Sequence, residues 1–208
     1  MADPKIRDQI KDHLLTPKNC ALIIIDYQPL SIGSVRSMDQ QLLVDNIVRV
    51  AKTAKAYGLP VVVSTAGVNT MGNKSMIPQL QEVLSDVRPI DRTTLNAWED
   101  PKFLEAVKST NRRKLVMTAI WTEVCLTFPA LDALREGYEV YPVVDAVGGT
   151  SVEAHKAGLE RIFQGGGHPT SWVQLINELQ RDSARQETIK AYLEILFNPR
   201  VPFLAAAQ

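Results

Sequence analysis

Cysteine, histidine and long apolar runs are scarce in this sequence. Its 208 residues include two cysteines and three histidines. The histidines, His13, His155 and His168, show none of the H-x-H, H-E-x-x-H or paired-cysteine spacings of zinc sites. We therefore expect no metal site. So few cysteines also favour a reduced, cytoplasmic protein over a disulfide-stabilised one.

An excess of charge of either sign is lacking too. The 23 Lys and Arg residues balance 23 Asp and Glu residues, and neither a basic stripe nor an acidic tail is present, which excludes nucleic acid as an expected partner. No run approaches the roughly 20 apolar residues of a membrane span. The first residues, "MADPKIRDQIKDHLL", are polar and amphipathic, unlike a secretory signal. The sequence also lacks G-x-G-x-x-G and Walker A motifs, so we expect no nucleotide cofactor.

Short β-branched runs alternate with longer amphipathic segments. Four runs read as strands covered on both faces: 20–26 (CALIIID), 59–65 (LPVVVST), 114–120 (KLVMTAI) and 138–146 (YEVYPVVDA). The segment 168–172 (HPTSW) is interpreted as a short fifth strand. This order predicts an α/β protein in which a mostly parallel sheet lies between two layers of helices.

The amphipathic segments carry helix start and stop signals. Residues 38–58 place their apolar side chains on one helical face and end at a glycine. Asp100, Thr122 and Ser151 stand where N-caps are expected. We predict one domain over residues 1–208, with helical additions at about 1–19 and about 172–208. The apolar tail 198–208 (NPRVPFLAAAQ) is expected to dock on its own core or on another subunit.

Three residues with reactive side chains follow strands, where α/β sheets bind ligands. They are Asp26, Cys125 and Asp145. Asp26 follows five apolar residues, and a carboxylate there needs solvent, a partner or a hydrogen bond. It is either a turn-capping residue or a general base with a raised pKa. For Asp145 a structural turn is the favoured role.

Cys125 also has two interpretations. Most lone cysteines are small buried apolar side chains. If Thr122 caps the following helix, however, Cys125 lies in its first turn, where the helix dipole lowers a thiol pKa and favours the reactive thiolate. Cys20 begins a strand and is interpreted as structural. His155 lies inside a helix and is expected to pack or hydrogen-bond.

Three ordered segments together are more specific than any one of them. They are "ALIIIDYQ", "RTTLNAW" and "IWTEVCLTFPALDALREGYEVYPVVDA". In this order they resemble the isochorismatase-like cysteine hydrolases, and most closely their YcaC-like branch, over about residues 20–170. The resemblance implies a Rossmann-like three-layer fold and a catalytic triad of Asp26, Arg92 and Cys125. Taken alone, Arg92 lies in a polar stretch typical of surface arginines.

The resemblance also implies the surroundings of the triad. It places a cis peptide bond between Ile120 and Trp121, and an oxyanion hole made by the backbone N–H groups of Trp121 and Cys125. Trp98, Trp121 and Asn96 are candidate walls of a pocket for a small-molecule substrate. Related proteins of this branch also imply a homo-oligomer, with an octamer as the candidate size.

The sequence departs from the family pattern at several positions. Arg92 stands in place of the family lysine, Ala119 where glycine is frequent, and Pro129 where threonine is frequent. The Asp-x-His metal pattern of nicotinamidases is missing. The favoured function is hydrolysis of a small amide-type C–N bond through a cysteine thioester. The alternatives are vinyl-ether hydrolysis of an isochorismate-type substrate and a non-catalytic binding or assembly protein.

Overall fold

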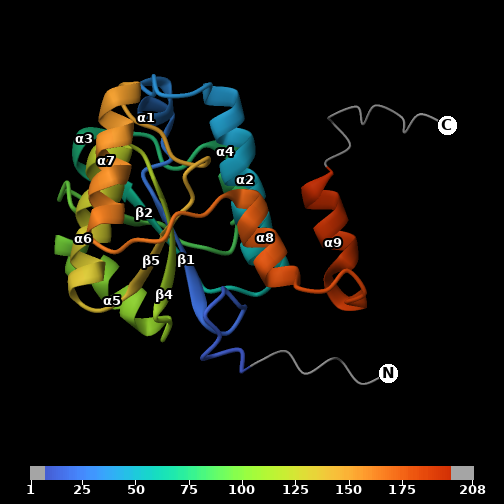
Figure 1. Ribbon diagram of the computed structural model, residues 1–208. Coiled ribbons are helices and arrows are strands. Elements are labelled where there is room, and N and C mark those ends of the chain that lie inside the picture. Colours follow the sequence, from blue (N-terminus) through green and yellow to red (C-terminus); the bar gives the residue numbers. More distant parts are fainter. Residues whose placement is uncertain (1–7, 198–208) are drawn as a thin grey trace.

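One sheet of five parallel strands forms the centre of the protein (Figure 1). The computed structural model describes residues 8–197. The strand order is β3-β2-β1-β4-β5. The strands are β1 (Cys20–Ile25), β2 (Val61–Ala66), β3 (Ile90–Arg92), β4 (Lys114–Ala119) and β5 (Glu139–Pro142). All residues of β1 and β4 are buried, as expected for apolar strands covered on both faces.

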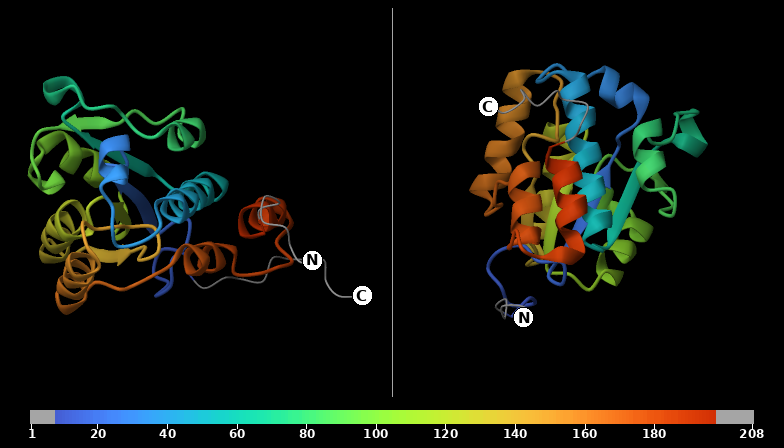
Figure 2. Two further views of the ribbon diagram at one scale, coloured as in Figure 1. Left: turned by 90° about the horizontal axis from the view of Figure 1, so that it is seen from above. Right: turned by 90° about the vertical axis from the view of Figure 1, so that its right-hand side faces the viewer.

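Helices cover both faces of the sheet (Figures 1 and 2). Because side chains alternate along a strand, Leu22 and Ile24 enter one core while Ile23 and Ile25 enter the other. The first core is closed by α2 (Gln40–Ala56), α4 (Pro78–Val83), α8 (Trp172–Gln180) and α9 (Gln186–Leu196). The second is closed by α5 (Pro101–Ser109), α6 (Thr127–Arg135) and α7 (Val152–Gln164). The predicted three-layer arrangement is confirmed.

The shorter helices lie in the connections. They are α1 (Pro29–Gly33), α3 (Val68–Met71), the 3-10 helix η1 (Ala97–Glu99) and the π-helix η2 (Thr122–Leu126). Figure 1 places α1 and α3 at the carboxyl ends of the strands. Among residues 8–197, no helix is both long and apolar enough to cross a membrane.

The strand order reverses direction between β1 and β4. From β1 the chain moves outward through β2 to β3, whereas β4 and β5 extend the opposite edge. Ile25 pairs with Ala119, so the carboxyl ends of these two strands lie side by side. Such a switch point opens a crevice that helices do not cover, and it is the usual ligand site of open α/β sheets.

Local sequence signals account for several helix boundaries. The Asp39 side chain accepts a hydrogen bond from the Leu42 N–H at 2.8 Å at the start of α2. Asp100 and Ser151 cap α5 and α7 in the same way, as predicted. Gly58, just beyond α2, has a φ of 65°, which a side chain would disfavour.

The strands differ from the prediction in two places. The sequence analysis missed β3, because its three residues lie in a polar stretch and become a strand only by pairing with β2, where Ala66 is opposite Arg92. The predicted fifth strand at 168–172 is reduced to an isolated bridge between Val143 and Thr170.

The N-terminal segment also differs from its prediction. Residues 8–19 form turns rather than a helix. Side chains there bond nearby backbone groups, which competes with helix formation. Asp12 accepts from the Leu14 N–H at 3.0 Å, and Asn19 accepts from the Thr16 N–H at 2.8 Å. The predicted closing helices are present as α8 and α9, whereas the tail 198–208 lies outside the described residues.

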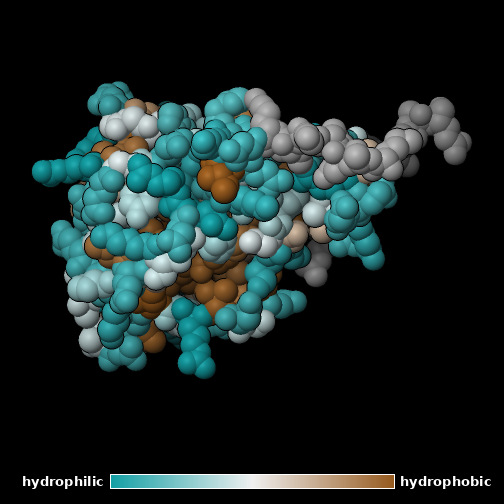
Figure 3. All heavy atoms as spheres, turned by 90° about the horizontal axis from the view of Figure 1, so that it is seen from below, coloured by the Kyte–Doolittle hydropathy of each residue, from teal (hydrophilic) through white to brown (hydrophobic). Residues whose placement is uncertain are grey.

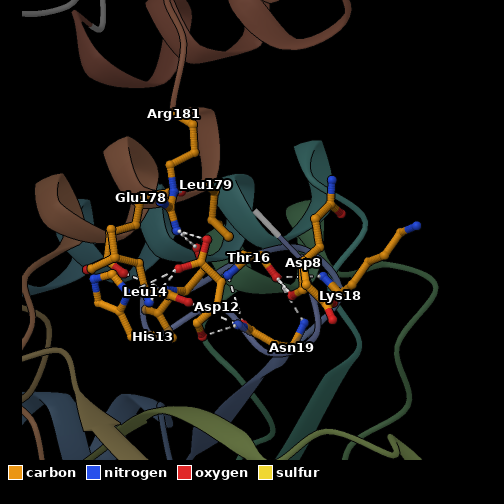
Figure 4. Close-up of polar contacts among 12 residues, drawn as sticks. Asp8, Asp12, His13, Leu14, Thr16, Lys18, Asn19, Glu178, Leu179 and Arg181 are labelled. Atoms are coloured by element: carbon orange, nitrogen blue, oxygen red, sulfur yellow. Dashed lines mark hydrogen bonds and ion pairs between the residues drawn. The ribbon is translucent and has the colours of Figure 1, made fainter. Parts of the chain in front are cut away.

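Lys114, at the start of β4, binds the N-terminal segment through hydrogen bonds to its backbone. Its Nζ donates to the carbonyl oxygens of Asp12 at 2.9 Å and His13 at 2.6 Å. Arg181, just beyond α8, pairs with Asp12 at 3.3 Å (Figure 4). Glu178 on α8 accepts a hydrogen bond from the Leu15 N–H. On the face at the amino ends of the strands, a patch of apolar surface is surrounded by polar side chains (Figure 3).

We predict that Lys114→Met lowers the free energy of unfolding by about 2–3 kcal/mol, because the carbonyls of Asp12, His13 and Leu14 lose a charged donor. Urea unfolding measures the change. Lys108→Met is the matched control, since the Lys108 side chain is 54% exposed and meets Glu136 at 3.7 Å only. Equal losses in the two variants would contradict the anchoring role of Lys114.

Candidate active site

Asp26 lies at the corner where the chain leaves β1. It adopts a φ of 62°, a left-handed conformation that is uncommon outside glycine. Two backbone hydrogen bonds hold this corner: the Asp26 N–H donates to Ser64 O at 3.0 Å, and the Gln28 N–H donates to Asp26 O at 2.8 Å. The residue is only 3% exposed, so its carboxylate depends on protein partners.

Arg92 supplies the charged partner of Asp26. It is the last residue of β3, and its Nη2 pairs with Asp26 Oδ2 while its Nη1 donates to the carbonyl oxygen of Thr94. Both side chains are buried. The predicted association of Asp26 with Arg92 is therefore present, and the arginine is not at the surface.

Cys125 completes the cluster from the other side of the switch point. It lies on η2, which follows β4, and it is buried. Among the described residues, Asp26 Oδ1 has no hydrogen-bond partner of regular geometry. The Cys125 thiol nevertheless lies near enough to hydrogen-bond the Asp26 carboxyl and lower its pKa. One carboxylate oxygen thus binds the arginine, and the thiol interacts with the same carboxyl group.

The expected low pKa of the Cys125 thiol was wrong. Burial, with smaller contributions from the Asp26 charge and the hydrogen bond to Asp26, raises the pKa of Cys125 to about 12. Burial also raises the pKa of the Asp26 carboxyl, against the opposing effects of Arg92 and Cys125. For Cys125 these effects outweigh the lowering of the thiol pKa that a position at a helix start would cause. The resting Cys125 thiol is therefore neutral, and burial disfavours charge on both groups.

Proton transfer from Cys125 to Asp26 costs less free energy than the pKa of Cys125 alone implies. Two of the causes that raise the Cys125 pKa, the Asp26 charge and the hydrogen bond to Asp26, require an ionised carboxylate. The charge repulsion disappears once Asp26 takes the proton, and the hydrogen bond then runs from the carboxylic acid to the thiolate. The two groups therefore titrate as a pair rather than as independent sites.

Trp121, not Thr122, occupies the N-cap position of η2, and no side chain caps this helix. The Thr122 hydroxyl instead contacts His155 Nδ1 at 2.8 Å, which corrects the predicted cap. The Ile120–Trp121 peptide bond is cis. A hydrogen bond from the Trp121 backbone lowers the pKa of Cys125, and the Trp121 indole N–H donates to Ser34 Oγ at 2.7 Å.

The polar groups of Trp98 and Asn96 bind partners on or next to α6. The Trp98 indole N–H donates to Glu136 at 2.8 Å, and its ring makes an edge contact with Tyr138 at 5.5 Å. Asn96 accepts the Trp98 N–H at 3.0 Å and donates to Asp132 at 2.7 Å. These contacts belong to the core between η1, α5 and α6, so both residues stabilise η1.

The remaining residues from the sequence analysis have structural contacts. Asp145 accepts the Trp172 N–H at 3.0 Å and so fixes the start of α8, which agrees with a structural turn. The His168 ring lies against Tyr141 at a centroid distance of 5.2 Å. Cys20 is buried and its thiol donates to Thr16 O at 3.1 Å.

Gln28 is a site residue that the sequence analysis missed. It is fully buried, its Oε1 accepts the Ala66 N–H at 2.9 Å, and its Nε2 donates to Lys74 O at 2.7 Å. These bonds join the Asp26 corner to the loop after β2. No local signal could have shown this, since the partners lie about 40 residues away along the chain. Within residues 8–197, no group of three or more His, Cys, Asp or Glu side chains could hold a metal ion.

Comparison with known proteins agrees with this architecture. The YcaC structure from Pseudomonas aeruginosa, described with hexane-2,5-diol and covalent acrylamide, superposes with a TM-score of 0.83 at 28% identity, covering 88% of this chain and 90% of that one. The Escherichia coli YcaC structure, described as an octameric hydrolase of unknown specificity, gives a TM-score of 0.80 at 27% identity, covering 91% and 97%.

The sequence comparisons identify the family. The probable hydrolase YcaC of Escherichia coli is 31% identical over 169 residues, which is 81% of each chain. The isochorismatase domain matches residues 20–174. Together with the parallel sheet and its switch-point site, these matches establish that the chain belongs to the isochorismatase family of hydrolases.

Proposed function

We propose that this protein is a cysteine hydrolase that cleaves a small amide-type C–N bond through a thioester on Cys125. One observation carries the proposal. Arg92 holds one oxygen of the buried Asp26 carboxyl group, and the Cys125 thiol interacts with that same carboxyl group. A base within reach of a nucleophile, and itself held by a third group, is the arrangement of nucleophilic catalysis.

In the first half of the reaction, Asp26 takes the thiol proton and the Cys125 sulfur forms a bond to the substrate carbonyl carbon. The carbonyl π electrons move to oxygen. We assign that oxygen to the backbone N–H groups of Trp121 and Cys125, each worth about 3 kcal/mol in comparable sites. When the tetrahedral intermediate collapses, the C–N bond breaks and the leaving nitrogen takes the proton from Asp26.

In the second half, water replaces the amine. Asp26, ionised again, removes a proton from water while the oxygen attacks the thioester carbon. The C–S bond breaks, the proton returns to sulfur, and a carboxylic acid leaves. Arg92 stays charged throughout, so it orients Asp26 and balances negative charge but transfers no proton.

Two relatives support parts of this proposal. The Pseudomonas aeruginosa YcaC structure is described with covalent acrylamide, and acrylamide is an electrophile that thiolates attack. The Escherichia coli YcaC is described as an octamer, so we propose a homo-oligomer here, with an octamer as the candidate size. Both cysteines are free, in keeping with our proposal that the protein acts in the cytoplasm.

The first prediction from the proposed function concerns thiol reactivity. Iodoacetamide should alkylate Cys125 in preference to Cys20 in the folded protein, as measured by peptide mass spectrometry. Cys20 is inaccessible because it is fully buried in β1. Cys20→Ala is the control and should leave the labelling rate unchanged. Equal labelling of the two thiols would refute a nucleophilic Cys125.

The second prediction concerns the reaction. In a library of small amides, imides and carbamates, hydrolysis should fall by at least about a thousandfold in Cys125→Ala. Isochorismate is the discriminating substrate, because vinyl-ether hydrolysis needs a proton donor but no nucleophile. Isochorismate turnover that survives in Cys125→Ala would favour that alternative. A parent protein without activity on any of these substrates, and with an inert Cys125, would favour the binding or assembly role.

The third prediction concerns the pKa of Asp26. Because Arg92 opposes the effect of burial, Arg92→Met should raise the Asp26 pKa further. Since the mechanism needs ionised Asp26, the loss of activity at low pH should then begin at higher pH. Carbon-13 NMR of the carboxyl group measures the titration directly. Arg92→Lys keeps the positive charge and should cause a smaller rise; identical titrations in all three proteins would contradict this role of Arg92.

A further inference from the structure

The helix that carries Cys125 is held from the side of α7. The Thr122 hydroxyl contacts His155 Nδ1 at 2.8 Å. On the adjacent residue, Glu123 Oε1 accepts hydrogen bonds from the Thr150 N–H at 2.9 Å and from its hydroxyl at 2.6 Å. The Thr122 N–H donates to Gly148 O at 2.9 Å. Thus two consecutive residues at the start of η2 are tethered to the segment 148–155.

The backbones of η2 and α7 are also in close contact. A Cβ atom at Gly158 would lie 2.9 Å from Glu123 Cα and 3.1 Å from Glu123 N. These are backbone atoms, so they could not rotate away, and only glycine allows α7 to come this near. A shift of α7 would therefore move η2 directly.

This support matters because η2 has no cap of its own. No side chain caps its first turn, and Cys125 lies only three residues beyond Thr122. Without a local cap, the orientation of this turn depends on contacts from distant parts of the chain. Thr122 is fully buried, so loss of its partner would not be replaced by water.

We propose that His155 is a positioning residue for Cys125: it holds the Thr122 hydroxyl and thereby fixes the turn that presents the Trp121 N–H and the Cys125 thiol. His155 acts through Thr122 and does not touch the reacting atoms. This inference rests on the proposed function for its catalytic consequence. The mechanism above gives no role to His155, although it is a half-buried titratable group next to the helix of the nucleophile.

A matched pair of variants tests the contact. Asparagine keeps a polar atom at the δ position of residue 155, whereas leucine has a similar branched shape without one. His155→Leu should therefore speed amide hydrogen exchange across residues 121–126 by about tenfold, the equivalent of one hydrogen bond. It should also slow alkylation of Cys125 and lower kcat by a similar factor with little change in KM. His155→Asn should stay near the parent in all three.

The partner residue gives an independent comparison if His155→Leu fails to fold. Thr122→Val should reproduce the loss, and Thr122→Ser should not. In the double variant the two losses should not add, because both remove the same contact. Additive losses, or equal exchange and alkylation rates in His155→Leu and His155→Asn, would overturn the inference.

Failure of the proposed function has a different signature. An inert Cys125 in the parent protein refutes the nucleophile itself. Hydrogen exchange still decides whether His155 fixes the turn, since that measurement needs neither substrate nor a reactive thiol. A reactive parent thiol that is unaffected in His155→Leu leaves the hydrolase proposal standing and removes His155 from it.

Discussion

The buried ion pair between Asp26 and Arg92 is the constraint on which the site depends. Removal of one partner from such a pair typically costs about 3–5 kcal/mol, because the other charge is left buried and unpaired. The pair also depends on the register of three strands. Strand β2 lies between its two partners: Ser64 bonds the Asp26 corner on one side, and Ala66 is opposite Arg92 on the other. The sheet is therefore the scaffold that brings together two residues 66 positions apart in the sequence.

Much of the fold follows from patterns within one segment. Continuous apolar runs predicted the strands β1, β2, β4 and β5, and local capping residues predicted where α5 and α7 begin. The predictions failed where a segment takes its structure from residues far away in the sequence. The three residues of β3 are a strand only beside β2, and residues 8–19 are held in turns partly by Lys114, about 100 positions away.

The site was predictable as a set of residues but not in its energetics. The family resemblance selected Asp26, Arg92 and Cys125, which the structure brings together. Local reasoning then gave the wrong direction for the Cys125 pKa, because it considered the helix start and not the burial or the neighbouring carboxylate. Trp98 and Asn96 remain candidate pocket residues. Their side chains turn to partners near α6, which no sequence spacing indicates.

The placement of the two thiols has a consequence for oxidation. Cys20 begins β1, and Cys125 lies beyond the carboxyl end of the neighbouring strand β4. The length of such a strand, about 15–20 Å, separates them, whereas a disulfide requires Cα atoms within about 7 Å. An intramolecular disulfide can therefore form only after β1 and β4 have separated. Its presence in a sample would record past unfolding of individual chains, even after the oxidant is gone.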